Sequence, residues 1–211
     1  FAFLSIFIVF FSCSRSAIRD SINMNWSITN DNIDNGIELY EGHNPKVPLK
    51  AWVVRIPSKG NEINILVSDE NDGVSTPSSI GLKWGASVII NGGYFTRGQK
   101  PIRHVGLLKS KDSLYEPASS AVYREKIRYN TNRGAFAINY DNSVDISWAS
   151  TRNDSIFSWS FPFKNRPGKP ALINYIFSEH WKVKEAIHAG PILMQNKNIN
   201  VTSEQEVFFN T

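Results

Sequence analysis

The sequence predicts an α+β fold built on a mixed, mostly antiparallel β-sheet with a few helices. Three observations support this: short runs of alternating apolar residues, turn residues between those runs, and a helix signal ahead of each of two apolar strands. The 211 residues are 41% hydrophobic and 20% charged, which supplies enough apolar side chain for a packed core. A chain of this length forms one domain or two.

The first block of the chain predicts a hairpin followed by a helix. Two β-rich runs, 50–56 and 62–68, flank the turn-forming residues 57–61. Thr76 and Pro77 then supply an N-cap and a proline at the first helical position. We therefore expect a short helix before an apolar strand over 86–90.

The second block predicts further strands and a second helix. Strands are expected over 105–108, 121–129 and 134–148, the last interrupted by a turn at Asp141-Asn142. Residues 170–185 carry an apolar face at helical spacing, formed by Leu172, Ile173, Ile176 and Phe177. We expect this helix to lead into an apolar strand over 186–194.

The N-terminal segment, residues 1–13, resembles a signal peptide with a bacterial lipobox. Residues 1–11 are apolar apart from Ser5, a run too short to span a bilayer as a helix but typical of a signal-peptide core. Cys13 would then be the lipidated residue of an exported, membrane-anchored lipoprotein of the cell envelope. The alternative is a buried N-terminal element with an ordinary core cysteine.

Two further parts follow this segment. Residues 14–36 are polar and rich in Asn without a sustained period, which predicts a tether, and residues 37–211 form the expected domain. The last residues, 208–211, are strand-like and have no terminating turn. With no initial Met either, we expect the chain to be cut at both ends.

The cysteine and histidine content excludes several kinds of site. A single Cys cannot form an internal disulfide, and Cys-rich zinc modules need more thiols. The four His lack the spacing of a zinc motif. The acidic run 69–73 superficially resembles a calcium loop but lacks the regular alternation of one, so an acidic hairpin is the favoured explanation. We expect no metal and no cofactor.

Positive charge is concentrated in the middle of the chain. Residues 97–133 hold nine basic and three acidic side chains, whereas the chain as a whole carries a formal charge of +4. This local excess suits an anionic ligand such as a phosphate, although a solvated face of strands is the alternative. Nucleic acid is disfavoured as a partner of an exported protein.

The most distinctive motif is Asn91-Gly92-Gly93-Tyr94-Phe95, which directly follows an apolar run. Two glycines permit positive φ and let a ligand approach main-chain N–H groups closely. Asn91 offers both a donor and an acceptor to a sugar hydroxyl or a phosphate oxygen. The alternative is a plain hairpin turn, because Asn-Gly and Gly-Gly are common hairpin dipeptides.

Three blocks of the chain together resemble the phosphodiester glycosidase family. Residues 90–95 are similar to the family's Asn-Gly-Gly-Tyr/Phe-Phe signature, residues 133–141 to its next strand and turn, and residues 186–194 to its Gly-Pro-x-Leu strand. The resemblance spans roughly 52–201, and only the first block is specific on its own. The family's Arg-Thr-Ala-Ile-Gly strand and Asp-Gly-Gly-Gly-Ser loop do not occur before Thr211.

The resemblance implies a hydrolase that cleaves sugar-1-phosphodiester bonds in surface or environmental glycans, with this chain as the N-terminal part of the catalytic domain. It makes Asn91 the candidate catalytic residue and assigns no catalytic carboxylate. A glycan or sugar phosphate would be the substrate. The residues expected to bind it are Gly92, Gly93, Tyr94, Phe95, Arg103, His104, Arg133, His188 and Gly190.

The chemistry of a phosphate leaving group supports the basic residues of this set, and three of the residues also have alternative structural roles. A phosphate leaving group needs charge stabilisation by Arg, Lys or N–H donors more than it needs full protonation. Arg103 has an alternative role as a surface charge, His104 as a hydrogen-bonded structural imidazole, and His188 as a core residue. The alternative functions are a non-catalytic glycan- or phosphate-binding lipoprotein and a purely structural envelope domain.

Overall fold

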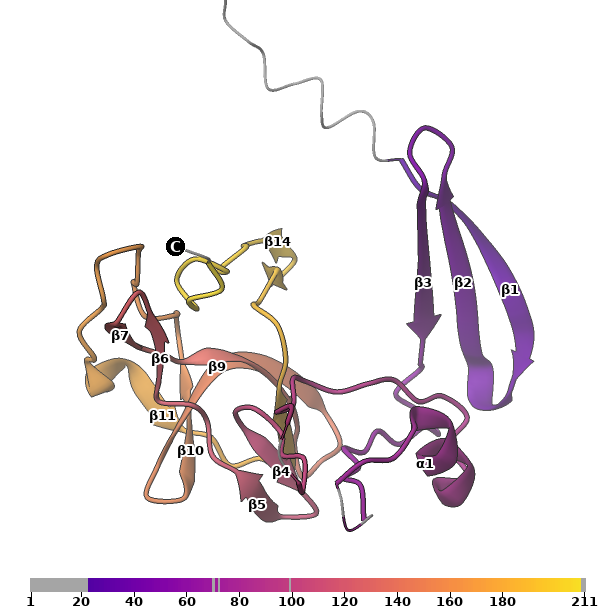
Figure 1. The fold of residues 1–211 in the computed structure, drawn as a ribbon. Coiled ribbons are helices and arrows are strands. Elements are labelled where there is room, and N and C mark those ends of the chain that lie inside the picture. The colour runs from indigo at the N-terminus through magenta and orange to yellow at the C-terminus, as the bar shows by residue number, and fades with distance from the viewer. Residues whose placement is uncertain (1–22, 70, 72, 99, 210–211) are drawn as a thin grey trace, which may run out of the picture. The chain divides into compact units, whose positions relative to one another are not determined.

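The computed structural model describes residues 23–209 except 70, 72 and 99 (Figure 1). The chain divides into two compact units, Phe1–Asn61 and Glu62–Thr211. Every strand pair in the described residues is antiparallel, and the described part has a single α-helix. The expectation of a mostly antiparallel β-rich fold is therefore confirmed, and that of several helices is reduced to one α-helix with short 3₁₀ turns.

The first unit is a three-stranded meander. Its strands, in spatial order, are β1 (Asn25–Ile33), β2 (Ile37–Asn44) and β3 (Leu49–Arg55). The β1–β2 turn is the 3₁₀ segment η2 (Asp34–Gly36). Thus residues 25–36, expected to belong to a polar tether, are ordered by pairing with β2.

The expected hairpin between 50–56 and 62–68 does not form. Strand β3 pairs instead with β2, and the ion pair between Arg55 and Glu38, at 3.1 Å, links the two strands. Residues 62–68 form no strand, because their main chain is bound by a side chain: the Ile65 N–H donates to the buried Glu185 carboxylate at 2.5 Å.

The second unit is built on a seven-stranded antiparallel sheet with the order β11-β10-β9-β8-β12-β4-β5. Neighbours in the sheet are mostly neighbours in sequence, except where β12 lies between β8 and β4. The strands are β4 (Leu108–Ser110), β5 (Ser113–Glu116), β8 (Arg133–Ile138), β9 (Val144–Arg152), β10 (Ser155–Trp159), β11 (Ser178–His180) and β12 (Glu185–His188).

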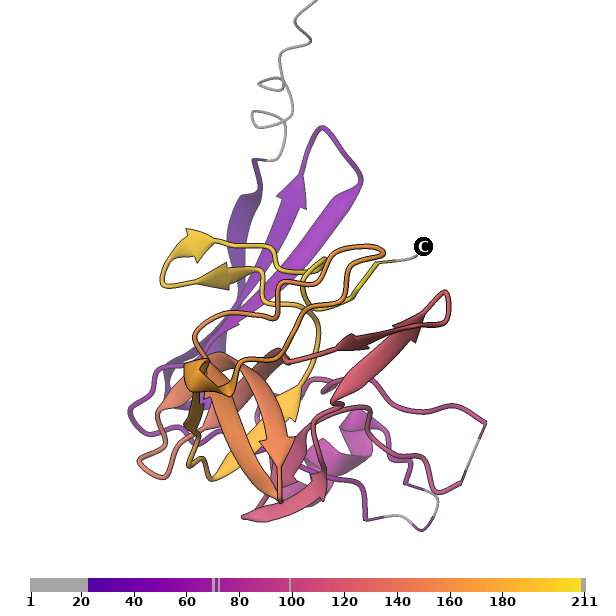
Figure 2. The ribbon, with the colours of Figure 1, turned by 90° about the vertical axis from the view of Figure 1, so that its left-hand side faces the viewer.

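Two small hairpins complete the second unit (Figure 2). The first joins β6 (Ala121–Arg124) to β7 (Ile127–Asn130), and the second joins β13 (Met194–Gln195) to β14 (Asn198–Ile199). Each has a two-residue loop in which both residues have positive φ, a conformation that matches the twist of a hairpin. The turn expected at Asp141-Asn142 also forms, with Asn142 at φ 63°.

Helix α1 (Pro77–Trp84) forms as the sequence predicts. The Thr76 side chain accepts from the Ser79 N–H at 3.1 Å, Pro77 occupies the first turn, and Gly85 ends the helix in the left-handed conformation. The apolar strand expected next, over 86–90, is absent: this segment has no ladder partner among the described residues, and Ile90 is 81% exposed.

The helix expected over 170–185 is wrong. The segment instead contains a 3₁₀ turn, η3 (Tyr175–Phe177), and strand β11, which pairs with β10. Two residues of the expected apolar face, Leu172 and Ile176, are 94% and 80% exposed. The sheet ladder and the Asn174 side chain, which accepts from the Ile176 N–H at 3.2 Å, replace the helical hydrogen bonds.

The core of the second unit lies on the central strands. Small side chains let the strands pack closely, and a second cluster stacks Trp159 edge-on against Phe163 with ring centroids 4.7 Å apart. The buried residues of the main cluster are Leu107, Ala118, Ala135, Ala137, Ala149, Ile156, Val183 and Ala186.

Candidate functional site

The three blocks that carry the family resemblance converge in space. Strand β8 pairs with β12, which places Ala135 opposite His188. Gly134 lies against the chain that follows β12, since a Cβ on it would be 3.2 Å from the Gly190 oxygen. Gly92 and Gly93 pack directly on β12, against Ile187 and His188. The three sequence blocks therefore meet at β12 and the residues that follow it.

Gly92 and Gly93 are needed for close approach and not for positive φ. Neither has a left-handed φ, contrary to the expectation from the double glycine. A Cβ on Gly92 would lie 2.6 Å from Ile187 Cδ1, and a Cβ on Gly93 would overlap the His188 carbonyl oxygen and lie 2.6 Å from His104 Nε2. The hairpin-turn alternative is also wrong, because no two-residue hairpin loop forms here.

The start of the motif is open to solvent. Asn91 and Gly92 are exposed, and Gly93 is half-buried. Within the described part of the chain, the main-chain amides of these three residues make no hydrogen bond. Their N–H groups are thus available to a ligand, whereas in a sheet they would be used by the ladder.

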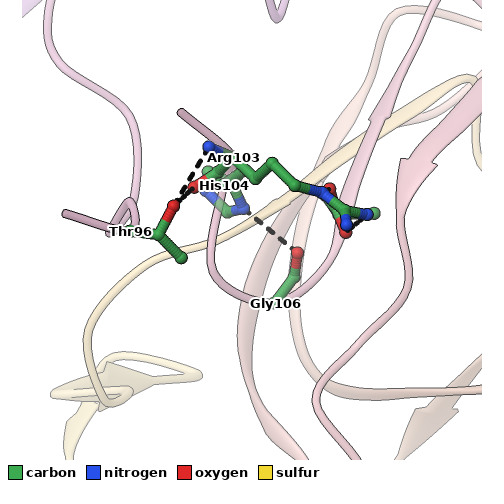
Figure 3. Close-up of polar contacts among 5 residues, drawn as sticks. Thr96, Arg103, His104 and Gly106 are labelled. Atoms are coloured by element: carbon green, nitrogen blue, oxygen red, sulfur yellow. Dashed lines mark hydrogen bonds and ion pairs between the residues drawn. The ribbon is translucent and has the colours of Figure 1, made fainter. Parts of the chain in front are cut away.

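The motif continues into a narrow loop that brings Arg103 and His104 back to it (Figure 3). The Thr96 N–H donates to the Arg103 oxygen at 2.9 Å, and the Val105 N–H donates to the Tyr94 oxygen at 2.7 Å. The Thr96 hydroxyl also accepts from the Arg103 N–H at 3.2 Å. These hydrogen bonds fold the loop back, so that Arg103 and His104 lie beside the motif.

Arg103 is held by an acidic partner. Its guanidinium makes two hydrogen bonds to the Glu116 carboxylate, Nε to Oε1 at 2.5 Å and Nη2 to Oε2 at 3.0 Å. Such a fork-shaped pair neutralises the cation and fixes its orientation. Of the alternatives weighed for Arg103, the structure places it as a surface charge engaged with a neighbouring strand.

His104 has an ordered tautomer. Its Nδ1 lies 3.1 Å from the Gly106 carbonyl oxygen, which can only accept, so Nδ1 carries the proton. The other nitrogen, Nε2, is buried and makes no hydrogen bond to a described residue. Burial lowers the pKa of His104, against a smaller opposing effect of the Gly106 carbonyl. The imidazole is therefore neutral at physiological pH.

His188 is buried in the interior, with only 3% of its surface exposed. Burial lowers its pKa to about 3, and the nearby Arg133 and His104 act in the same direction. Its Nε2 likewise has no hydrogen-bond partner among the described residues. His188 thus lies beneath the motif as a neutral core residue, which is the alternative role weighed for it.

Arg133 is a half-buried cation near Tyr94 of the motif. Its Nε donates to the main-chain oxygen of Glu206 at 3.1 Å, and its guanidinium carbon lies 4.2 Å from the centroid of the Phe208 ring. That ring in turn packs near Tyr94, with centroids 6.2 Å apart. Burial lowers the pKa of Arg133, and Arg124 adds to this effect. Its Nη1 makes no hydrogen bond to a described residue.

Tyr94, Phe95 and Gly190 lie at the surface of this region. Tyr94 and Phe95 are about half exposed, and a Cβ on Gly190 would be 3.9 Å from the Tyr94 hydroxyl. The structure thus brings Gly92, Gly93, Tyr94, Arg133 and Gly190 to one face, with His104 and His188 beneath it.

Glu206 is a buried carboxylate that sequence reasoning missed. It is fully buried and accepts four hydrogen bonds. The donors are Gly134 N at 2.6 Å, Trp148 Nε1 at 2.9 Å, Ile192 N at 3.0 Å and Thr202 Oγ1 at 2.5 Å. No local motif marks this residue, because three of its four donors come from distant segments and the turn 203–207 around it has no sequence signature.

The basic excess over 97–133 is distributed over separate internal contacts. Besides Arg103 and Arg133, these cations include four more that bind groups of the protein. They are Lys109, which donates to the Val183 oxygen at 2.5 Å, Lys111, which lies 4.0 Å from the Trp84 ring centroid, Arg124, which donates to the Phe209 oxygen at 3.0 Å, and Arg128, which donates to Asn130 Oδ1 at 2.5 Å.

Other expectations fall outside what the structure describes. Cys13 belongs to residues that it does not describe, as do two positions of the acidic run 69–73. Among the described residues, no three His, Cys, Asp or Glu side chains are close enough to hold a metal ion. No described helix is both long and apolar enough to cross a bilayer.

Comparisons with protein families, characterised proteins and solved structures find no match to this chain. The candidate site consequently rests on its geometry and on the resemblance of the three sequence blocks.

Proposed function

We propose that this protein is a hydrolase that cleaves sugar-1-phosphodiester bonds in surface or environmental glycans. The observation that carries the proposal is the convergence of the three blocks: Gly92 and Gly93 pack on β12, and Gly134 of the second block packs on Gly190. Segments separated by up to about a hundred residues thus meet at β12, as residues that share one binding site must.

The exposed groups of this face suit the proposed substrate. The unpaired N–H groups of Asn91 and Gly92 can donate to phosphate oxygens, and Arg133 contributes positive charge near Tyr94. The Asn91 side chain, also exposed, can bind a sugar hydroxyl. Donors fixed by a packed framework stabilise developing negative charge without reorganising.

The reaction is a hydrolysis. Water adds to the anomeric carbon, and the bond from that carbon to the phosphate oxygen breaks with its electron pair moving to that oxygen. The products are the free sugar and a phosphate monoester, which takes up the proton released by water. The pKa of such a monoester is about 6, so stabilisation of its charge contributes more than protonation.

A second candidate function is non-catalytic binding of a glycan or a phosphate. This function is favoured because two carboxylates near the motif are already engaged within the protein. Glu116 is paired with Arg103, and Glu206 accepts four hydrogen bonds. Neither can act as the acid or base that a glycosidase ordinarily uses.

The proposed location is the bacterial cell envelope, with a lipid anchor on Cys13. The apolar run ahead of Cys13 supports this assignment. Expression of the chain in a bacterium, with the Cys13→Ala variant beside it, tests the anchor. The thiol-containing chain should fractionate with membranes and the variant should not; equal fractionation would contradict the anchor.

The test of the function uses a sugar 1-(alkyl phosphate) and measures release of reducing sugar. The full-length protein should release sugar, and Asn91→Ala should abolish release with a melting temperature unchanged within a few degrees, since the Asn91 residue is exposed. Tight binding of the diester without any release would favour the second candidate. If the protein neither binds the diester nor releases sugar, both candidate functions are contradicted.

A further inference from the structure

The chain contains two Asn-Gly pairs, Asn35-Gly36 and Asn91-Gly92. Such a pair is chemically labile, because the nitrogen of the following residue can attack the Asn side-chain amide and glycine has no Cβ to obstruct the attack. In a folded protein the reaction also requires that the nitrogen be free and able to reach the side chain. The two pairs differ in how far the fold allows this.

The second pair is open. Asn91 and Gly92 are both exposed, and neither the Asn91 side chain nor the Gly92 N–H forms a hydrogen bond with a described residue. The preceding residues 86–90 pair with no strand in the described part of the chain, so no ladder fixes the angle between the Asn91 side chain and the Gly92 nitrogen. The two reacting groups can therefore meet.

Packing favours the glycine of this pair. A Cβ on Gly92 would lie 2.6 Å from Ile187 Cδ1, so the close approach to β12 is easiest with no side chain at this position. Asn91 is the side chain on which the proposed function depends. The fold and the candidate site thus keep a reactive pair together.

The first pair is held in a turn. Asn35 has φ 61° and ψ 28° inside η2, and the strands on either side of this turn pair with each other. At this ψ the Gly36 nitrogen lies on the opposite side of the Cα–C bond from the Asn35 side chain. Ring closure would require a large rotation about that bond and would break the turn, so the fold protects this pair.

We propose that Asn91 is a site of spontaneous deamidation and that it reacts far faster than Asn35. The Gly92 nitrogen loses its proton and attacks Asn91 Cγ, and the bond from Cγ to the side-chain nitrogen breaks so that ammonia leaves. Water then opens the succinimide ring at either carbonyl and gives aspartate or isoaspartate. The net reaction consumes a water molecule, releases ammonia and replaces a neutral amide by a carboxylate.

Deamidation should disable the candidate site, a consequence that rests on the proposed function. A carboxylate at Asn91 would lie beside the amides proposed to bind a phosphate, and like charges repel. Isoaspartate would also lengthen the main chain next to Gly92, which packs on Ile187. Activity should therefore fall as the modification proceeds.

Peptide mapping by mass spectrometry tests the modification. The protein is incubated for several weeks at neutral pH, and aspartate and isoaspartate are quantified at both Asn-Gly pairs. In the folded protein Asn91 should be converted at least tenfold faster than Asn35. In urea the two rates should become similar, because the fold no longer separates them. Equal rates in the folded protein, or an unmodified Asn91, would overturn the proposal.

Asn91→Gln is the matched variant, because attack on the longer glutamine side chain must form a larger ring and is much slower. The variant should gain no carboxylate at this position during the same incubation, and a gain equal to that of the unaltered protein would contradict the mechanism.

Release of sugar from a sugar 1-(alkyl phosphate) tests the consequence. In the aged protein, release should fall in proportion to the modified fraction of Asn91. Unchanged release from modified protein would contradict the role given to Asn91 and leave the deamidation site standing. Absence of release before ageing would contradict the proposed function, and the peptide map would still decide whether Asn91 deamidates.

Discussion

Two apolar segments of the second unit, 86–90 and 134–138, have similar sequences and very different structures. The second lies in β8, paired on both edges, with Ala135 and Ala137 buried. The first has no strand partner among the described residues and exposes Ile90. Apolar β-rich sequence thus makes a strand only where a neighbour supplies the ladder. The unpaired segment leads directly into residues 91–93, whose amides are open at the candidate site.

The largest expected loss of stability comes from removing the buried Glu206 carboxylate, which binds the Gly134 N–H of β8. Glu206→Ala should lower the free energy of unfolding by roughly 4 kcal/mol, because its four donors would lose a buried acceptor at once. Urea unfolding measures this. The exposed neighbour Glu204 is the matched control, and Glu204→Ala should cost less than about 0.5 kcal/mol. Equal effects of the two variants would contradict the assigned role.

The close packing of Gly92 and Gly93 on β12 is tested at Gly93. Gly93→Ala should destabilise the protein by about 2 to 3 kcal/mol, because the added Cβ would overlap the His188 carbonyl and lie 2.6 Å from His104 Nε2. Gly190→Ala is the control, since its Cβ would be no closer than 3.9 Å to another group. If thermal unfolding shows the two variants to be alike, Gly93 does not pack on β12 as described.

The buried strand β12 should also make the free energy of unfolding depend on pH, through His188, and this effect is smaller than the two above. His188 has a pKa of about 3 when folded and 6.5 as its ordinary value, so below pH 6.5 the unfolded chain binds a proton that the folded chain does not. Stability therefore falls as the pH drops through this window, by about 2 kcal/mol between pH 7.5 and 5.0. The lowered pKa of His104 acts in the same direction.

Urea unfolding at several pH values measures this slope. His188→Gln cannot take up the proton in either state, so the variant should lose most of the pH dependence between 7.5 and 5.0, whatever its stability at pH 7.5. An unchanged slope would mean that His188 is accessible to solvent.

Local signals predicted local structure well. The Thr76 cap, Pro77 and Gly85 define α1, and the Asp141-Asn142 turn joins two paired strands as expected. The errors came where long-range contacts decide the outcome. Residues 62–68 look like a strand but are bound by Glu185, and 170–185 has a helical period but is paired by β10. No window of sequence contains those partners.

The candidate site shows the same division. Gly92 and Gly93 were singled out in part for positive φ, whereas the structure requires glycine there for close approach to β12. Arg103 returns to the motif as expected, yet its charge is taken by Glu116, which lies on another strand. No sequence motif marked Glu206, because three of its hydrogen-bond donors come from distant segments that meet only in the fold.

The central claim is that the open amides beside the buried strand bind a sugar phosphate ester. Amide chemical shifts of the ¹⁵N-labelled chain, recorded while a sugar 1-(alkyl phosphate) is added, test it most directly. We predict saturable shifts at Asn91, Gly92 and Tyr94, and their loss in Asn91→Ala. Shifts confined to residues elsewhere in the chain, or no shifts at all, would contradict the claim.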